Sequence, residues 1–231
     1  MAPGHEELAL AEFSAKAHAL GLKDITSAAI PGGFEFEAPW ELGRGTVHLL
    51  KIPTRVLVRL HTFTARDFPK MYNVLKALPW NTWLQHPHPE LKITAHECRL
   101  MHTGRAEESW RKALCEAQVR QPFSTRWQTE KHPPDLLLLR GFKDQWSLSL
   151  DLAGEALYKR GPAREKNEAP MRETHAAAVL AKLFATPPAH PVTLLDPLCG
   201  SGTFLWEALN FFRPSERRFA YLTSPLNKGV A

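Results

Sequence analysis

The sequence predicts an α+β protein in which two small mixed units are followed by a strand, a glycine turn and a helix. Three observations predict this class. Stretches with the two-residue alternation of strands interchange with stretches of helical period. Proline-rich or charged segments at 79–89 and 162–168 separate them. Finally, "VTLLD" before "PLCGSGT" has the apolar character of a buried parallel strand that leads into a glycine turn.

The first predicted unit covers residues 1–78. An amphipathic helix is expected over 6–20, then strands in "KDITSAAI" and "FEFEA", and a helix that begins after Pro39. The strand "TRVLVRLHTFTA" is expected to place Val56, Val58, Leu60 and Thr62 on one face. Asp67 is expected to cap a helix that runs to Leu78.

The second predicted unit covers residues 79–161. "LKITAHECRL" is expected to form a strand, and "HTGRAEESWRKALCEAQVR" a helix. Its apolar positions with a helical period are Ala106, Trp110, Ala113, Leu114 and Ala117. "PDLLLLRGFKDQWSLSLDL" predicts a hairpin with a turn around Gly141 to Asp144, which "GEALYKRG" extends. The tryptophans are expected in the core rather than as base-stacking platforms.

Composition narrows the class of protein. The 231 residues are 44% hydrophobic and 23% charged, as in ordinary globular proteins. A net charge of +5 is compatible with a polyanionic partner without proving one. Neither an apolar run of membrane-spanning length nor a signal peptide is present, and three cysteines without CxxC spacing indicate neither disulfides nor zinc. We therefore expect a cytoplasmic protein.

The glycine turn is the segment that suggests chemistry. Asp196 ends the predicted strand, and Gly200, Ser201 and Gly202 precede a helix expected from about Thr203. Glycines permit positive φ and close approach of a ligand, and a helix N-terminus offers unpaired N–H groups. Neither GxxxxGK[ST] nor GxGxxG is present, and an acid before the turn suits the positive charges of S-adenosylmethionine. From spacing alone, a turn that serves packing only is an equal alternative.

Four segments together resemble a known family. "LLDPLCGSGTFLWEAL" is similar to the cofactor motif of bacterial rRNA guanine-N2 methyltransferases that carry a THUMP domain. "DLAGEALYKRGPAR" is similar to the end of their THUMP domain, and "EAPMRETHAAAVL" to a helix beside their cofactor pocket. "PPDLLLLRGFKDQWSLSLDL" fits the THUMP hairpin, and the segments occur in the order found in the family.

This resemblance implies a domain order and a cofactor site. Residues 1–78 would be a ferredoxin-like region, 79–161 a THUMP RNA-binding domain, and 162–231 the start of a Rossmann-like methyltransferase domain. S-adenosylmethionine would be the methyl donor and an RNA the substrate, with 23S rRNA as the first choice and tRNA as the alternative. The positions that match the family's cofactor site are Asp196, Cys199, Gly200, Ser201, Gly202, Thr203, Pro170, Arg172 and Thr174. We expect Cys199 to be a buried small hydrophobic residue rather than a nucleophile.

Two basic groups are candidates for RNA contact. Arg105, Arg111 and Lys112 lie on the predicted helix, where acids four residues away also allow a solvated face of ion pairs. Lys159, Arg160 and Arg164 form a denser group, which could alternatively be a basic linker. The pair His86 and His88 lacks a third ligand at suitable spacing, so we expect no metal site.

The sequence departs from the family after the glycine turn. It contains neither an acid at the end of a second strand, which would hold the ribose, nor an [ND]PP[YF] motif. A fragment, a truncated product or half of a split enzyme would each explain this. We therefore expect the RNA-binding part of an S-adenosylmethionine-dependent methyltransferase that is inactive alone. The alternatives are a non-catalytic THUMP RNA-binding protein and a protein that docks a partner methyltransferase chain.

Overall fold

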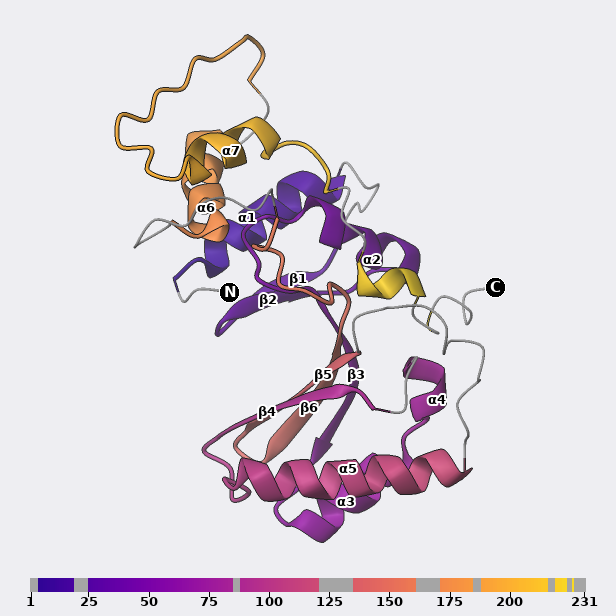
Figure 1. The fold of residues 1–231 in the computed structure, drawn as a ribbon. Coiled ribbons are helices and arrows are strands. Elements are labelled where there is room, and N and C mark those ends of the chain that lie inside the picture. The colour runs from indigo at the N-terminus through magenta and orange to yellow at the C-terminus, as the bar shows by residue number, and fades with distance from the viewer. Residues whose placement is uncertain are drawn as a thin grey trace. The chain divides into compact units, whose positions relative to one another are not determined.

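The chain forms two compact units in a computed structural model (Figure 1). One unit comprises Met1–Val56 and Glu155–Arg218, and the other Leu57–Gly154 and Phe219–Ala231. We call them the split unit and the sheet unit. The structure describes residues 4–18, 25–84, 88–120, 135–160, 171–184, 188–215, 219–223 and 226. None of the described helices is long and apolar enough to cross a membrane.

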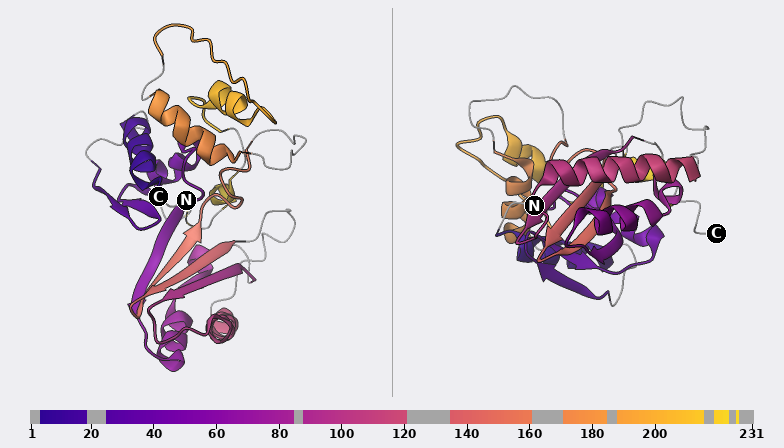
Figure 2. Two further views of the ribbon diagram at one scale, coloured as in Figure 1. Left: turned by 90° about the vertical axis from the view of Figure 1, so that its left-hand side faces the viewer. Right: turned by 90° about the horizontal axis from the view of Figure 1, so that it is seen from below.

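The sheet unit is built on a four-stranded sheet with the order β3-β6-β5-β4. β4 runs parallel to β5, and the other neighbours are antiparallel. Two helices, α3 and α5, pack side by side on one face of this sheet (Figures 1 and 2). The elements are β3 (Leu57–Thr64), α3 (Phe68–Ala77), α4 (Trp80–Trp83), β4 (Glu90–His96), α5 (Thr103–Arg120), β5 (Leu136–Phe142), β6 (Gln145–Asp151) and the 3₁₀ helix η3 (Ala220–Thr223).

The core of the sheet unit lies between the sheet and its helices. All five apolar positions predicted for the helix at 103–120 are buried, which confirms that helix and its face. Trp80, Trp110 and Trp146 are also buried, as expected for core residues. Asp67 caps α3, because its Oδ1 accepts a hydrogen bond of 2.8 Å from the Lys70 amide. The predicted cap is therefore confirmed.

The predicted hairpin is present as β5 and β6. Lys143 and Asp144 occupy its turn with φ of 49° and 63°, the left-handed conformation that two-residue hairpin turns require. Asp144 also accepts a hydrogen bond of 2.8 Å from the Arg99 amide. The predicted extension of the hairpin through "GEALYKRG" is wrong. β6 ends at Asp151, and Gly154 then turns the chain with φ of 76°.

β3 differs from the strand predicted for it. A β-bulge between Arg59 and His61 shifts the register against β6. Val58, Leu60 and Phe63 consequently pack against the core, whereas Thr62 is exposed. The prediction that Thr62 continues the apolar face is wrong, because a strict two-residue alternation does not survive the extra residue of a bulge. β3 also pairs with β6, so residue 78, the predicted boundary, falls inside the sheet unit.

The split unit joins the N-terminal segment to the segment that follows the hairpin. Its elements are α1 (Glu6–Ala17), β1 (Ser27–Ile30), β2 (Gly33–Phe36), α2 (Trp40–Leu49), α6 (Glu173–Leu183) and α7 (Thr203–Asn210). β1 and β2 form an antiparallel hairpin, and Phe13 of α1 packs against Phe34 and Phe36 with ring centroids 5.1 and 4.3 Å away. α1, α6 and α7 share a core that includes Ala9, Ala177 and Leu180.

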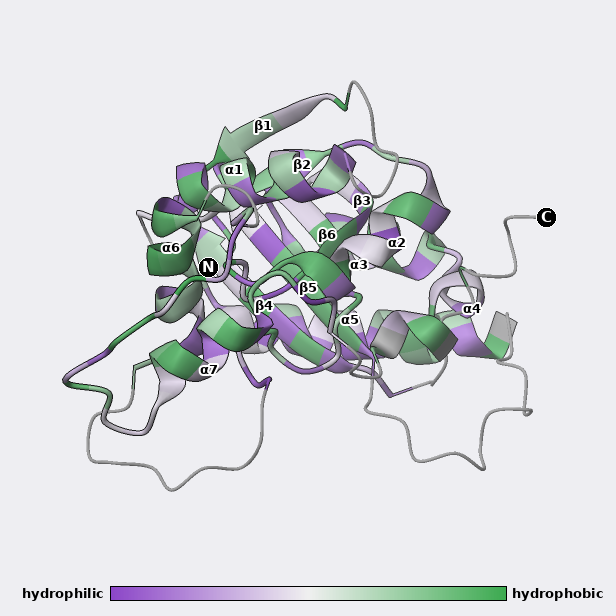
Figure 3. Cartoon of the chain, turned by 90° about the horizontal axis from the view of Figure 1, so that it is seen from above, coloured by the Kyte–Doolittle hydropathy of each residue, from purple (hydrophilic) through white to green (hydrophobic). Residues whose placement is uncertain are grey.

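The strand predicted at "VTLLD" is not formed. Residues 191–196 belong to no helix or strand and pair with no strand of the described chain, and Val192 and Leu195 are exposed. The physical reason is that a parallel strand needs neighbours to satisfy its backbone groups and cover its side chains. Figure 3 shows hydrophobic residues on this segment and on α7.

Gly141 supplies a test of the packing of the sheet unit. A Cβ at this position would lie 2.9 Å from the Cys98 sulfur and from atoms of the buried Trp146 ring. We expect Gly141→Ala to lower the free energy of unfolding by about 1–3 kcal/mol, because a rigid core must then repack. Gly104→Ala is the matched control, since a Cβ there meets nothing within 4 Å, and it should be neutral or stabilise by about 0.5 kcal/mol. Denaturant unfolding measures the free energy of unfolding of both variants. Equal changes in the two would contradict the close packing around Gly141.

Candidate cofactor turn and the ion pair beneath it

The glycine turn has the backbone geometry that the sequence indicates. Gly200 and Gly202 have φ of 52° and 72°, and the Gly202 amide donates a hydrogen bond of 2.7 Å to the Cys199 carbonyl. α7 then begins at Thr203, as predicted. Nothing lies within 4 Å of the position that a Cβ on Gly202 would take. The turn therefore presents bare, left-handed backbone to open space, which is what close approach of a ligand requires.

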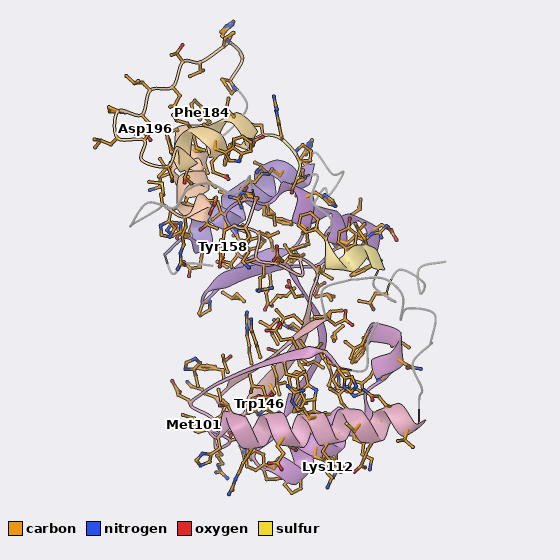
Figure 4. The ribbon with its side chains drawn as sticks, viewed as in Figure 1. Met101, Lys112, Trp146, Tyr158, Phe184 and Asp196 are labelled. Carbon is orange, nitrogen blue, oxygen red and sulfur yellow. The ribbon has the colours of Figure 1, made fainter. Side chains whose placement is uncertain are left out.

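The start of α7 has no side-chain cap. Its first N–H groups are therefore available to a ligand, and the helix dipole favours negative charge there. Asp196 shapes the approach to the turn, because its Oδ1 accepts a hydrogen bond of 3.0 Å from the Leu198 amide. Figure 4 shows Asp196 on the trace that precedes α7. Ser201 Oγ lies 3.1 Å from Thr203 Oγ1, which ties the turn to the first residue of the helix.

A buried ion pair between Arg160 and Glu207 fixes the middle of α7. Arg160 Nε lies 3.0 Å from Glu207 Oε1, and its Nη2 lies 2.9 Å from Oε2, a bidentate arrangement. The side chains are 10% and 1% exposed. The same guanidinium donates to the Leu157 carbonyl at 2.8 Å and to the Glu173 carbonyl at 3.2 Å. One side chain thus joins the segment after the hairpin, the first turn of α6 and the middle of α7.

A second buried carboxylate lies in α1. Glu12 accepts hydrogen bonds from the Lys51 and Ile52 amides at 2.8 and 3.0 Å, and from Lys16 Nζ at 2.6 Å. Lys16 Nζ also donates to the Leu49 carbonyl at 2.9 Å and lies 4.8 Å from the centroid of the Phe211 ring. Since Phe211 follows α7 directly, this group supports the other end of the same helix.

Lys51 adds an unusual amine to this interior. Its side chain is 4% exposed. Burial, together with the positive charge of Arg160, lowers the pKa of Lys51 to about 8, although the charge of Glu207 opposes the shift. The interior of the split unit around α7 thus contains two bonded carboxylates, Glu12 and Glu207, beside three basic groups, Lys16, Lys51 and Arg160.

The predicted cofactor residues fall into two places. Asp196 to Thr203 form the turn, with Thr203 buried. Arg172 and Thr174 lie at the start of α6, which Arg160 ties to α7 through the Glu173 carbonyl. Thr174 is buried, and the Arg172 guanidinium lies 6.0 Å from the ring centroid of Tyr158. Pro170 lies outside the described residues, and α6 begins at Glu173 with Arg172 as its N-cap.

Two expectations for single residues are wrong. Cys199 is exposed rather than buried, because no sheet covers the segment before the turn. Arg160 is not a surface group for phosphate, because its guanidinium is buried and bonded to Glu207 and to two carbonyls. Arg164 lies outside the described residues. Lys159 is exposed and pairs with Glu155 at 3.6 Å.

The basic residues predicted on the helix at 103–120 lie on α5. Arg105 and Lys112 are exposed, and Lys112 lies on the side of the helix away from the sheet (Figure 4). Arg111 is exposed but bonded to Glu107 at 2.7 Å, the i,i+4 pair expected from the sequence. Among the described residues, no group of His, Cys, Asp or Glu is placed to hold a metal ion.

The sequence reasoning missed Glu12, Lys16 and Lys51. A signal was available for Glu12, since it lies four residues after Leu8 and therefore on the apolar face of α1. An acid in an apolar stripe indicates a buried partner. Lys51 carried no comparable signal, because its burial depends on segments distant in the sequence.

The part of the chain that contains this turn is similar to known proteins. Residues 160–221 match a family model described as "RMKL-like, methyltransferase domain". Ribosomal RNA large subunit methyltransferase K/L of Photobacterium profundum is 32% identical over 195 residues, which are 82% of this chain and 26% of that protein. This chain is similar to the K/L large-subunit ribosomal RNA methyltransferases. It spans about a quarter of the length of the curated relatives that it matches. Both Arg160 and Glu207 lie within the matched region.

Solved structures share the mixed α/β fold. A protein of Listeria monocytogenes str. 4b F2365, described as a predicted N6-adenine-specific DNA methylase, superposes with a TM-score of 0.76 at 26% identity. The match covers 96% of this chain and 57% of that chain. SMU.472, whose crystal structure is a complex with SAH, has a TM-score of 0.72 at 23% identity, and the match covers 94% of this chain and 57% of that chain.

The ion pair beneath the turn can be tested by removing one charge at a time. Arg160→Met should lower the free energy of unfolding by about 3–5 kcal/mol, because it leaves the Glu207 carboxylate buried without a partner. The double variant Arg160→Met with Glu207→Leu should recover most of this loss. Arg172→Met is the control, an exposed arginine of the same unit, and should cost under about 1 kcal/mol. Denaturant unfolding measures these free energies. An Arg160→Met variant that is as stable as the parent chain would contradict a buried ion pair.

Proposed function

We propose that this chain is the RNA-binding part, and the beginning of the methyltransferase domain, of an S-adenosylmethionine-dependent rRNA methyltransferase. Its target would be the exocyclic N2 of a guanine in 23S rRNA, with tRNA as the alternative RNA, and its location the cytoplasm. The relationship to the K/L methyltransferases carries this proposal. Further methyltransferase residues beyond those matched here would supply the groups that hold the guanine.

S-adenosylmethionine fits the glycine turn. Left-handed Gly200 and Gly202 leave open space above the backbone, and the uncapped start of α7 offers N–H groups. The Asp196 carboxylate supplies negative charge before the turn, which suits the amino or sulfonium group of this cofactor. When bound, the cofactor supplies an electrophilic methyl group. The residues of this chain contribute position rather than proton transfer, which is the main source of catalysis for an in-line displacement.

The sheet unit is proposed to hold the RNA. We propose that the sheet unit is a THUMP domain and that the N-terminal region is ferredoxin-like. β3 belongs to the RNA-binding unit, because it pairs with β6. Arg105 and Lys112 of this unit, and Lys159 of the split unit, are candidate phosphate contacts, since all three are exposed. Arg111 would have to exchange its Glu107 partner for a phosphate.

Exposed apolar side chains around the turn support the proposal that further methyltransferase strands pack beside it. Leu195 and Leu198 are 82% and 91% exposed, and Leu209 of α7 is 70% exposed. Residues 191–196 pair with no described strand, so strands on either side would satisfy their backbone groups and cover these side chains. This observation supports the second candidate, a protein that docks a partner methyltransferase chain, because either a continuing or a separate chain could supply the strands.

A chimera tests this proposal. The remaining methyltransferase residues of a K/L relative, fused after Phe212, should transfer labelled methyl groups from S-adenosylmethionine to 23S rRNA. Mass spectrometry of the digested RNA should identify N2-methylguanosine. Asp196→Ala in the chimera should weaken cofactor binding at least about tenfold, since it removes a charged hydrogen-bonding group from the turn.

The control is Glu155→Ala, an exposed acid of the same unit, which should leave cofactor affinity unchanged. Tight binding of S-adenosylmethionine by the 231-residue chain alone would contradict an incomplete pocket. Methylation of adenine, or of DNA in preference to RNA, would contradict the proposed substrate.

A further inference from the structure

The face of the four-stranded sheet opposite α3 and α5 carries exposed polar and basic side chains. Alternation along β4 and β5 places Leu91, Ile93, Leu137 and Leu139 against the helices. The intervening residues point the other way. We call the exposed part of this surface the open sheet face, and it consists of Lys92, Thr94, His96, Arg140 and Phe142, all of which are exposed.

Strand register brings these residues together. Thr94 is opposite Arg140, and His96 is opposite Phe142, in the parallel β4–β5 pair. Arg140 and Phe142 are two residues apart on β5, so their side chains leave the same face about 6.6 Å apart. Ser147 of β6 is the next neighbour of Arg140 and bonds its carbonyl rather than its guanidinium.

Phe142 is the unusual member of this face. It is 55% exposed, whereas the other Phe, Tyr and Trp side chains described in the sheet unit are buried or half-buried. Lys143 Nζ lies 5.1 Å from the centroid of its ring. An aromatic ring left in water beside cations is a platform on which a base can stack next to a charge that attracts phosphate.

The charges of the open sheet face are unbalanced. Arg140 and Lys92 are exposed cations there, and Arg59 lies on the same side of the sheet opposite Ser149. Glu90, at the first position of β4, pairs with Lys92 at 3.3 Å, and Glu97, directly after β4, pairs with Lys143 at 3.7 Å. Arg140 therefore carries the positive charge that these two acids leave over.

On the face of the sheet unit that α3 and α5 form, two basic side chains are paired with acids. Arg111 is bonded to Glu107, and Lys76 to Glu116 at 2.5 Å. The bonds from Lys76 and Tyr72 lower the pKa of Glu116, so this acid stays ionised. The charges of Arg111 and Lys76 are therefore neutralised by acids beside them, so a polyanion gains less from these two groups than from Arg140.

We propose that the open sheet face binds single-stranded RNA, with a base stacked on Phe142 and phosphates held by Arg140 and Lys92. This inference rests on the proposed function and names the surface through which the RNA is held. A base can reach an exposed ring only when it is unstacked, so single strands and loops fit this surface better than a duplex. The combination of one aromatic platform with flanking cations tolerates different base sequences.

Fluorescence anisotropy of the full 231-residue chain with a labelled single-stranded RNA of about 12 nucleotides, within the site sizes of single-strand binders, tests the inference. Phe142→Ala should weaken binding at least about fivefold, by loss of stacking. Arg140→Gln should weaken it and reduce the slope of log affinity against log salt by about one. A duplex of the same length should bind more weakly than the single strand and respond less to Phe142→Ala.

Two controls lie in the same unit away from this face. Met101→Ala removes an exposed apolar side chain, and Lys70→Gln removes an exposed cation of α3. Both should bind the single strand within about twofold of the parent chain. Circular dichroism and unfolding midpoints confirm that every variant is folded.

The possible failures are distinguishable. If the parent chain shows no salt-sensitive RNA binding, the proposed function itself fails, and this surface with it. If the parent chain binds but Phe142→Ala and Arg140→Gln bind equally well, the surface alone is overturned. Sedimentation that shows self-association lost in Phe142→Ala, with RNA affinity unchanged, would make this face a protein contact and likewise overturn the inference.

Discussion

The buried ion pair between Arg160 and Glu207 is the constraint on which the arrangement of the split unit depends. A carboxylate that is 1% exposed needs a complete set of partners, and the guanidinium meets this need while it also bonds the Leu157 and Glu173 carbonyls. The bonds fix α7 relative to α6 and to the segment that leaves the hairpin. Because the glycine turn is the direct N-terminal continuation of α7, its place follows from the place of that helix.

This constraint explains how the glycine turn keeps its shape without a sheet around it. In a doubly wound fold, the strand before the turn is held by its neighbours. Here residues 191–196 pair with no described strand, yet Gly200 and Gly202 retain left-handed φ and α7 starts at Thr203. Glu12 and Lys16 support the far end of the helix through Phe211. Buried ion pairs and side-chain hydrogen bonds thus help to position α7 and the turn, as strand pairing does in a doubly wound fold.

Local patterns predicted the elements well and the long-range pairings poorly. The face of α5, the Asp67 cap and the turn at Lys143 and Asp144 depend on residues close in sequence, and each was predictable. The bulge in β3, the pairing of β3 with β6 and the burial of Arg160 depend on contacts between distant segments. Arg160 was assigned to RNA because a basic cluster looks the same in sequence whether its members face water or a buried acid. The turn residues 196–203 were predicted together because they are contiguous.

The central claim is that the ion pair, rather than a sheet, positions the glycine turn. Amide hydrogen exchange of Glu207→Gln against the parent chain tests it most directly, since this substitution keeps the side-chain shape and removes the charge. The account predicts faster exchange along Thr203–Asn210, with β5 and β6 of the sheet unit unchanged as an internal reference. Unchanged protection of α7 in the variant would contradict it.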